Sequence, residues 1–157
     1  MKIEDYIRYQ PESGLLFWKR DYARQLGGNR AGRIGSLGYI VLYFEKKYWF
    51  GHRLAWYLAT GNHPKEQIDH INGDRADNRL INLREASHGE NNRNRGAHKD
   101  NISGYKGVSY MKRDGRYKAR ININKTCVNL GHFDTALEAH KAYCDAVERY
   151  HGKFAKI

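Results

Sequence analysis

Hydrophobic and polar residues follow a short repeat in the first third of the chain, with turn residues between the apolar runs. Such runs of four to eight apolar and aromatic residues are typical of small antiparallel strands. The predicted strands are residues 14–19, 39–44 and 47–50, and glycine-rich residues 27–38 predict turns between the first two. The last two strands predict a hairpin that turns near Glu45-Lys46. Leu54, Ala55 and Leu58 then recur at helical spacing, which predicts a helix over residues 52–60 ending at Gly61.

The middle of the chain predicts a strand, a loop, a second strand and a helix. Ile68 precedes the adjacent pair Asp69-His70, and residues 72–74 (Asn-Gly-Asp) are a strong turn signal. Leu80, Leu83 and Ala86 supply the second apolar edge. Ser87 followed by Glu90 three residues later fits a capping box, so we expect a helix from Ser87 with Asn91, Asn94 and Arg95 on one face.

The last third of the chain alternates more strictly. Tyr117, Ala119, Ile121 and Ile123 alternate with polar and cationic residues, which predicts a half-buried strand. Residues 106–110 and 127–133 predict two more strands beside it, with a turn at residues 113–115. Asp134-Thr135 predicts the start of a helix with a buried stripe formed by Ala139, Tyr143, Ala146, Val147 and Tyr150. We therefore expect a three-stranded antiparallel sheet packed on one helix, with its other face open.

These patterns predict an α+β protein built from consecutive small parts. The predicted parts are a β-rich N-terminal part over residues 1–50, a strand–strand–helix unit over residues 51–96, a polar linker over residues 97–104 and a C-terminal domain over residues 105–157.

The charge of the chain indicates a polyanionic partner. The 157 residues include 28 Lys+Arg against 17 Asp+Glu and twelve tyrosines, which gives a formal net charge of +11. Between Glu90 and Lys125 there are ten basic and three acidic residues. A basic surface with aromatic side chains favours nucleic acid over a membrane, and a charge that serves only solubility is the alternative. The residues predicted to bind double-stranded DNA are Arg93, Arg95, Lys106, Lys112, Arg113, Arg116, Lys118, Arg120 and Asn122.

Cysteine content and hydropathy predict the compartment. Cys127 and Cys144 are the only cysteines and lack CxxC spacing, which fits a reducing environment. The chain has no run of 18 apolar residues, and its first ten residues lack the apolar segment of a signal peptide. We therefore expect an intracellular protein without a membrane segment.

The run from Gln67 to Asn92 combines metal-ligand oxygens with a base. Asp69 and Asn91 offer hard oxygen ligands suited to Mg²⁺, with Mn²⁺ as an alternative ion. His70 is substantially neutral at pH 7 and can take a proton from water, and Asn82 can pin the loop that holds it. Phosphodiester hydrolysis needs both a cation and a base, so we interpret the run as a candidate nuclease site. The alternative is that these are ordinary loop residues around a packed histidine.

The same region resembles the HNH endonucleases, also called ββα-metal nucleases, and especially their phage and intron-associated members. The resemblance rests on the segments HRLAWYLATG, IDHINGDRADNRLINLREAS and GENNRNR. It implies that Asp69 and Asn91 are metal ligands, His70 the general base and Asn82 the central structural asparagine. Arg95 stands where some members have a metal-binding histidine, and arginine does not ligate cations, which favours Mg²⁺.

Residues 105–157 resemble the plant ethylene-response-factor (Apetala-type) DNA-binding domain. The matching segments are GYKGVSYMKRDGRYKARI and LGHFDTALEAHKAYCDAVERYHGKFAKI. In that family the three-stranded sheet reads the major groove, but Ser109 and Met111 stand where arginines are usual, so the target sequence does not transfer.

Together the two resemblances imply a phage-type homing or nicking endonuclease. It would use one Mg²⁺ ion, act as a monomer or weak dimer and work inside the host cell. The alternative function is a non-catalytic, sequence-specific DNA-binding regulator.

Overall fold

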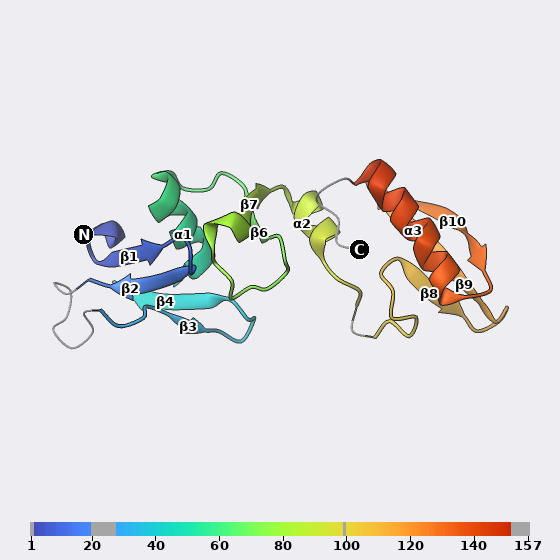
Figure 1. The fold of residues 1–157 in the computed structure, drawn as a ribbon, viewed down its shortest axis with the longest axis horizontal. Helices are drawn as coiled ribbons and strands as arrows, with labels where there is room; N and C mark the ends of the chain where they lie inside the picture. The colour runs from blue at the N-terminus through green and yellow to red at the C-terminus, as the bar shows by residue number, and fades with distance from the viewer. Residues whose placement is uncertain (1, 20–27, 99, 152–157) are drawn as a thin grey trace. The chain divides into compact units, whose positions relative to one another are not determined.

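The protein is described by a computed structural model that covers residues 2–19, 28–98 and 100–151. The chain divides into two compact units, Met1–Asn91 and Asn92–Ile157. Over the described residues it contains three α-helices and four small antiparallel sheets, so the predicted α+β class is confirmed (Figure 1). Gly27 of the predicted turn region and residues 152–157 of the predicted C-terminal domain lie outside the described residues.

The first unit begins with two small sheets and a helix. Their elements are η1 (Ile3–Asp5), β1 (Ile7–Gln10), β2 (Leu15–Trp18), β3 (Arg33–Ile34), β4 (Ile40–Phe44), β5 (Lys47–Phe50) and α1 (Gly51–Thr60). β1 pairs with β2, and β4 lies between β3 and β5. Glu45 and Lys46 both have positive φ, as a two-residue hairpin turn requires, so the predicted turn is confirmed.

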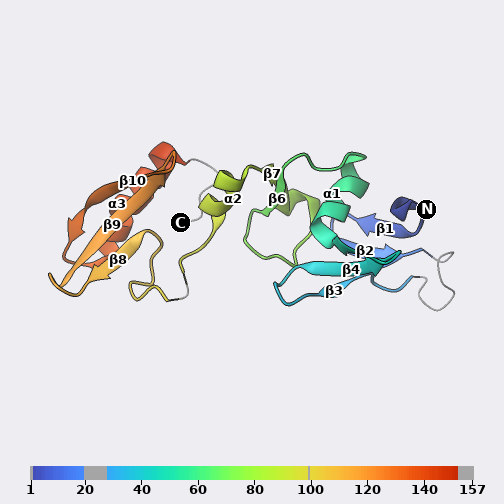
Figure 2. The same cartoon turned by 180° about the vertical axis from the view of Figure 1, so that it is seen from behind.

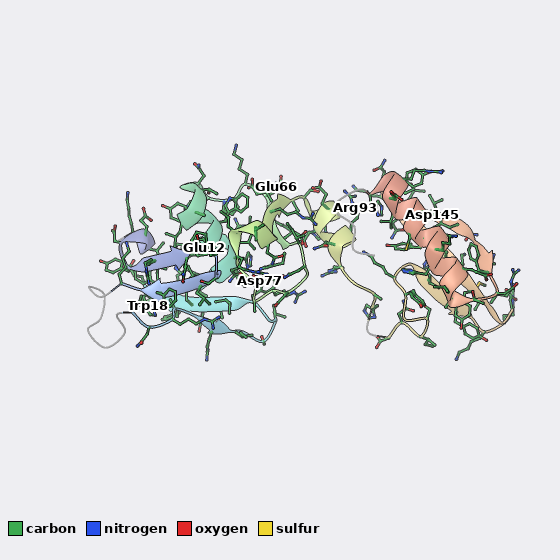
Figure 3. The ribbon with its side chains drawn as sticks, viewed as in Figure 1. Glu12, Trp18, Glu66, Asp77, Arg93 and Asp145 are labelled. Atoms are coloured by element: carbon green, nitrogen blue, oxygen red, sulfur yellow. The ribbon has the colours of Figure 1, made fainter. Side chains whose placement is uncertain are left out.

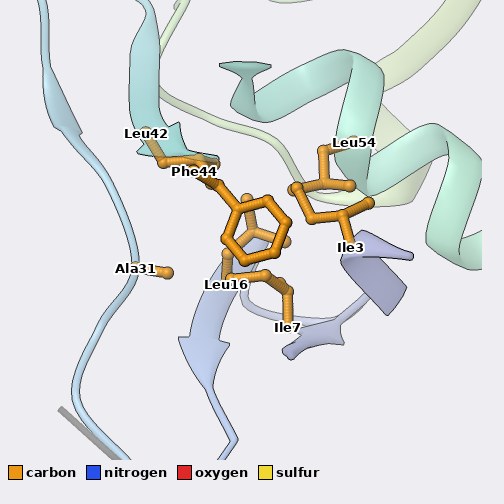
Figure 4. Close-up of a cluster of buried hydrophobic side chains, with 7 residues drawn as sticks. All are labelled: Ile3, Ile7, Leu16, Ala31, Leu42, Phe44 and Leu54. Atoms are coloured by element: carbon orange, nitrogen blue, oxygen red, sulfur yellow. The ribbon is translucent and has the colours of Figure 1, made fainter. Parts of the chain in front are cut away.

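The core of this unit gathers around Phe44. Its ring lies between the side chains of β1 and β2 and those of η1 and α1 (Figure 4). The buried members of the cluster are Ile3, Ile7, Leu16, Ala31, Leu42, Phe44 and Leu54. Because β1, β2, β4 and α1 share this core, the N-terminal hairpin is fixed against the helix that precedes the strand–strand–helix unit.

That unit follows α1 directly. β6 (Gln67–His70) and β7 (Leu83–Ala86) form an antiparallel hairpin, η2 (Leu80–Asn82) lies in the loop between them, and α2 (His88–Asn94) follows. Ile68 and Leu83 pack with Ala55 of α1 in a small cluster. The predicted capping box is present, because the Ser87 amide and hydroxyl both donate to Glu90 Oε2 at 2.8 and 2.7 Å.

The second unit is a sheet covered by one helix. β8 (Val108–Met111), β9 (Arg116–Ile123) and β10 (Thr126–Phe133) pair antiparallel with β9 in the centre. α3 (Ala136–Tyr150) covers one face and lies in front of the strands in Figure 1 and behind them in Figure 2. Thr135 and Glu138 form a capping box at its start.

The predicted buried stripe of α3 is confirmed except at its end. Ala139, Tyr143, Ala146 and Val147 are buried, whereas Tyr150 is 51% exposed. Tyr150 is the last residue of α3, and the cluster of buried residues against the sheet ends at Val147, so the prediction for Tyr150 was wrong. In the described part of the chain no helix is long and apolar enough to cross a membrane.

Candidate functional site

The β6–β7 hairpin directs its polar side chains to two faces. Side chains alternate along a strand, and directly paired residues share a face. Asp69 pairs with Arg84 on one face, and His70 pairs with Leu83 on the other. The adjacent Asp69 and His70 therefore leave the strand in opposite directions.

Asp69 is held by an arginine from the neighbouring strand. Arg84 donates to Asp69 Oδ2 through Nε at 2.9 Å and through Nη2 at 2.7 Å. Both side chains are largely removed from water, so this ion pair is poorly screened. Deleting only one partner leaves an uncompensated buried charge, which costs about 3–5 kcal/mol.

Asn91 reaches the same face of the hairpin from α2. Its Nδ2 donates to Gln67 Oε1 at 2.8 Å, and Gln67 lies two residues before Asp69. The Gln67 amide also lies 3.3 Å from His88 Nδ1. The carboxylate of Asp69 and the amides of Gln67 and Asn91 thus belong to one side of the strand–strand–helix unit.

His70 is buried, and the side-chain amide of Asn78 bonds to its ring. Its Nε2 lies 3.1 Å from Asn78 Oδ1, and only 4% of the residue is exposed. An amide oxygen only accepts hydrogen bonds, so Nε2 carries the proton and Nδ1 holds the basic lone pair. Burial lowers the pKa of His70 below its usual value, against the opposing effects of the Asn78 bond and of nearby Asp69. The ring is therefore neutral near pH 7.

A second histidine packs directly against His70. The rings of His52 and His70 meet edge to face with centroids 5.2 Å apart, and Tyr39 contacts both rings. Burial, with smaller contributions from His70 and Arg53, lowers the pKa of His52 to about 3. His52 Nδ1 is buried and has no hydrogen-bond partner among the described residues. This aromatic packing fixes the His70 ring from the side opposite Asp69.

The N-terminal hairpin holds the residue that orients His70. Tyr9 of β1 donates through its hydroxyl to the Asn78 carbonyl at 2.8 Å. Gly14, at φ 73°, lies so close that an added Cβ would stand 2.6 Å from the carbonyl carbon of Asn78. Gly51 at the start of α1 also lies close to Asn78, because a Cβ added there would stand 2.9 Å from Asn78 Nδ2. Residues far away in the sequence therefore fix Asn78 in place.

Asn82 closes the loop between β6 and β7. Its Oδ1 accepts from the Asn72 amide at 3.0 Å, and its Nδ2 donates to the Asp77 carbonyl at 2.8 Å. Arg79 donates to the Asp77 carboxylate, which lowers the pKa of Asp77 to about 2. Asp77 lies in this loop (Figure 3). The buried Asn82 thus bonds to both arms of the loop that leads away from His70.

The donor atoms on the Asp69 side suit a hard cation in their chemistry. A carboxylate and an amide oxygen are typical Mg²⁺ ligands, and this ion commonly takes few protein ligands. Asp69 and Asn91 would supply these ligand oxygens. The cation would then either share Asp69 Oδ2 with Arg84 or replace Arg84 at that oxygen. No group of three or more His, Cys, Asp or Glu side chains that could hold a metal occurs among residues 2–19, 28–98 and 100–151.

The second unit collects basic side chains on the open face of its sheet. Ala119 and Ile121 of β9 are buried toward α3, so Lys118, Arg120 and Asn122 point to the opposite face. Arg120 and Asn122 are exposed, and Lys118 is partly exposed.

The other predicted DNA-binding residues differ in how they are engaged. Arg116 donates to Asp134 at 2.9 Å, and Arg113 donates to Asp114 at 2.8 Å. Lys106 donates to the Arg93 carbonyl. Arg93 lies in α2 (Figure 3), and Arg95 and Lys112 are exposed. The charges of Arg113 and Arg116 are therefore partly offset by neighbouring carboxylates.

Residues before β8 border the open face of the sheet. Asn101 and Ser103 form a turn in which Asn101 Nδ2 donates to the Tyr105 carbonyl at 2.6 Å and Ser103 Oγ donates to the Val108 carbonyl at 2.9 Å. A cavity of about 390 Å³ is lined by residues 96–98 and 100–102 and by residues of β8 and β9, with Lys106 and Arg120 in its lining.

Several residues of the site were not predicted from the sequence. No role was predicted for Arg84, Gln67, His52 or Asn78. For Arg84 a signal exists, since a hairpin that pairs His70 with Leu83 places an arginine opposite Asp69. For Asn78 the decisive contacts come from β1 and the turn after it, and for His52 they come from Tyr39, Phe50 and His70, so no local pattern reveals the full set.

Comparison with known families finds two matches. Residues 50–93 match the family model described as HNH endonuclease, and residues 103–153 match the model described as AP2 domain. The two domains follow each other in the order that the sequence motifs predicted. Neither the curated proteins nor the solved structures yielded a match.

Proposed function

Because the chain contains an HNH endonuclease domain followed by an AP2 DNA-binding domain, we propose that it is a metal-dependent DNA endonuclease that hydrolyses phosphodiester bonds. The observation that supports this best is the buried His70, whose Nε2 is bonded to Asn78 and whose chain neighbour Asp69 lies on the same face of the hairpin as Gln67, the partner of Asn91. A histidine held neutral and in one tautomer, next in the chain to a proposed metal ligand, suits the activation of water.

In this proposal His70 is the general base. Asn78 holds the proton on Nε2, so Nδ1 takes a proton from the attacking water. Because burial favours the neutral ring, the base is ready at neutral pH. Asn82 keeps the loop after His70 closed, and the rings of His52 and Tyr39 prevent the imidazole from turning.

Asp69 and Asn91 are the proposed metal ligands. A bound Mg²⁺ or Mn²⁺ ion would neutralise charge on the phosphate and its leaving oxygen. Arg84 orients the Asp69 carboxylate, and the guanidinium is itself suited to contact a phosphate oxygen once a cation shares the carboxylate.

The AP2 domain is proposed to deliver this site to double-stranded DNA. Lys118, Arg120 and Asn122 would contact DNA through the open sheet face, and Arg93, Arg95 and Lys106 would contact the backbone nearby. One site cuts one strand, so a monomer would nick and a weak dimer would cut both strands. The motif combination further favours a phage-type homing or nicking role inside a host cell.

The test is cleavage of supercoiled plasmid DNA by the whole chain with Mg²⁺. The His70→Ala variant should lose cleavage and keep DNA affinity in a gel-shift assay, because the side chain lies outside the basic sheet. The Asp69→Asn variant keeps a hydrogen-bond acceptor for Arg84 and should need more Mg²⁺ for the same rate. If His70→Ala nicks the plasmid at the wild-type rate, His70 is not the base.

A specific observation favours one second candidate, a non-catalytic DNA-binding regulator. Arg84 already donates twice to the Asp69 oxygen that a cation would use. In that function the strand–strand–helix unit serves as a scaffold with an internal ion pair. Binding of DNA without cutting, under a titration of Mg²⁺ and Mn²⁺, would support the regulator over the nuclease.

A further inference from the structure

The first unit contains an aromatic cavity that has no part in the proposed cleavage step. It measures about 350 Å³ and lies between β5 and α1. Four aromatic residues line it, namely Tyr48, Trp49 and Phe50 of β5 and Tyr57 of α1, with Trp49 on the core side of the strand. A volume of this order falls at the lower end of the usual range for small-molecule sites.

The charged groups around the cavity have one sign. Its remaining lining includes Lys47, Arg53 and His63, and no aspartate or glutamate. Arg53 is fixed by hydrogen bonds to the carbonyls of Glu66 and Pro64, both at 3.1 Å. The His63 ring stacks on Tyr57 with centroids 4.2 Å apart and planes 6° from parallel. Arg53 and the His63 ring are therefore held in place beside the aromatic residues of the cavity.

Trp49 adds an unsatisfied donor to this surface. The Lys47 ammonium lies over its ring, 4.7 Å from the centroid. The indole Nε1 is buried and has no hydrogen-bond partner among the described residues. Buried donors are normally paired, so this N–H can donate to an acceptor of a bound molecule.

The cavity also lies next to the candidate base. The Phe50 ring is 5.5 Å from the His52 ring, and His52 is 5.2 Å from His70. A ligand beside Phe50 is thus separated from His70 by one histidine ring.

We propose that this cavity receives one unpaired nucleotide of the DNA substrate. Aromatic rings stack on any base, and the neighbouring cations attract its phosphate, which is the combination that single-stranded nucleic-acid sites use. An apolar ligand would not need Lys47 and Arg53, and an acidic peptide would not need four aromatic rings. The adjoining cavity of about 310 Å³ shares Lys47, Trp49, Tyr57 and His63 and is also bordered by Glu4 and Glu45, so the phosphate would lie near Arg53, which lines only the first cavity. The inference rests on the proposed function only in taking DNA as the polymer.

The experiment compares two DNA duplexes of one sequence in the presence of a metal chelator. One duplex is fully paired, and the other contains a single unpaired 2-aminopurine nucleotide. The whole chain should bind the bulged duplex more tightly, by about fivefold or more, since stacking of one base contributes about 1–3 kcal/mol. Stacking on the aromatic rings should also quench the 2-aminopurine fluorescence.

Two variants and a matched control test the location. Trp49→Leu should remove the preference and the quenching, and Lys47→Gln should weaken binding of the bulged duplex by about threefold to tenfold. Lys46→Gln removes the same charge one residue away, outside the lining, and should leave the preference unchanged. Because Trp49 also contacts the core, its fold is checked by circular dichroism, and Lys47→Gln remains decisive if Trp49→Leu fails to fold.

Equal affinity for the two duplexes overturns the proposal, as does a preference that is undiminished in Lys47→Gln. If Lys46→Gln removes the preference as fully as Lys47→Gln does, the contact lies on the exposed turn and not in the cavity, and the proposal is wrong. Because no metal is present, the result is independent of cleavage. A His70→Ala variant that prefers the bulged duplex but does not cut agrees with both the nucleotide cavity and the role of His70 as base. A variant that prefers the bulged duplex and still cuts overturns only the role of His70.

Discussion

Replacing His52 by phenylalanine should make the first unit less sensitive to acid. His52 is 8% exposed and lies among the rings of Tyr39, Phe50 and His70. Burial lowers its pKa from 6.5 to about 3, so the folded unit keeps this ring neutral over a wide range of pH. The unfolded chain takes up a proton near pH 6.5. Below that pH the unfolded state binds one more proton than the folded state, and the free energy of unfolding falls until about pH 3.

The expected size follows from linkage. Each pH unit between those two pKa values costs about 1.4 kcal/mol of stability for one such proton. At pH 5 the loss through His52 is about 2 kcal/mol, which is a large share of the roughly 5–15 kcal/mol that stabilises a typical domain. Phenylalanine cannot bind a proton, so the stability of the variant does not fall through this route. Between pH 7.5 and pH 5 the free energy of unfolding of the wild type should therefore fall by about 2 kcal/mol more than that of His52→Phe.

Urea unfolding followed by tryptophan fluorescence measures this directly. The chain has three tryptophans, Trp18, Trp49 and Trp56, and all lie in the first unit, so the signal reports that unit alone. Exposed His63→Phe is the matched control, because its ring is in contact with water in both states. The same pH dependence in the wild type and in His52→Phe would refute the reasoning, whatever the stability of the variant at pH 7.5.

The remaining predictions concern cleavage, the loop and the basic sheet. The cleavage rate should not change with pH until the pH falls below 6.5, and it should fall in more acid solution, because the base must be neutral and burial lowers the pKa of His70. A cleavage rate that already falls as the pH drops toward 6.5 would contradict this. A chelator should abolish cleavage while leaving gel-shift affinity in place, and added Mg²⁺ should restore the cutting. Asn82→Ala should lower the free energy of unfolding of the first unit by about 1–3 kcal/mol, as measured by urea unfolding, because it removes the two hydrogen bonds of the buried Asn82 side chain. Lys118→Ala should lower DNA affinity and reduce the salt dependence of binding by about 0.9 in slope, whereas ion-paired Arg116→Ala should change the slope less; an unchanged slope for Lys118→Ala would mean that it contacts no phosphate.

The local patterns of the sequence were sufficient for most secondary structure. The strict alternation over residues 117–123 corresponds to β9, and the capping boxes at Ser87 and Thr135 mark the starts of α2 and α3. These signals are short-range, since a strand's period and a helix cap depend on residues within a few positions. Tyr150 was assigned to the buried stripe by the same period and is exposed, because the period does not show where the packing partner ends.

The sequence by itself determined the chemistry available to this protein: an Asp-His pair, two asparagines at family spacing and a basic sheet after them. Only the tertiary structure decided how that chemistry is positioned. Asn78 meets His70 because Tyr9 and the turn at Gly14 hold its backbone, across more than sixty residues of sequence. Arg84 meets Asp69 through strand pairing. Contacts of this kind depend on which elements share a core, and that is a property of the whole folded unit rather than of any local run of residues.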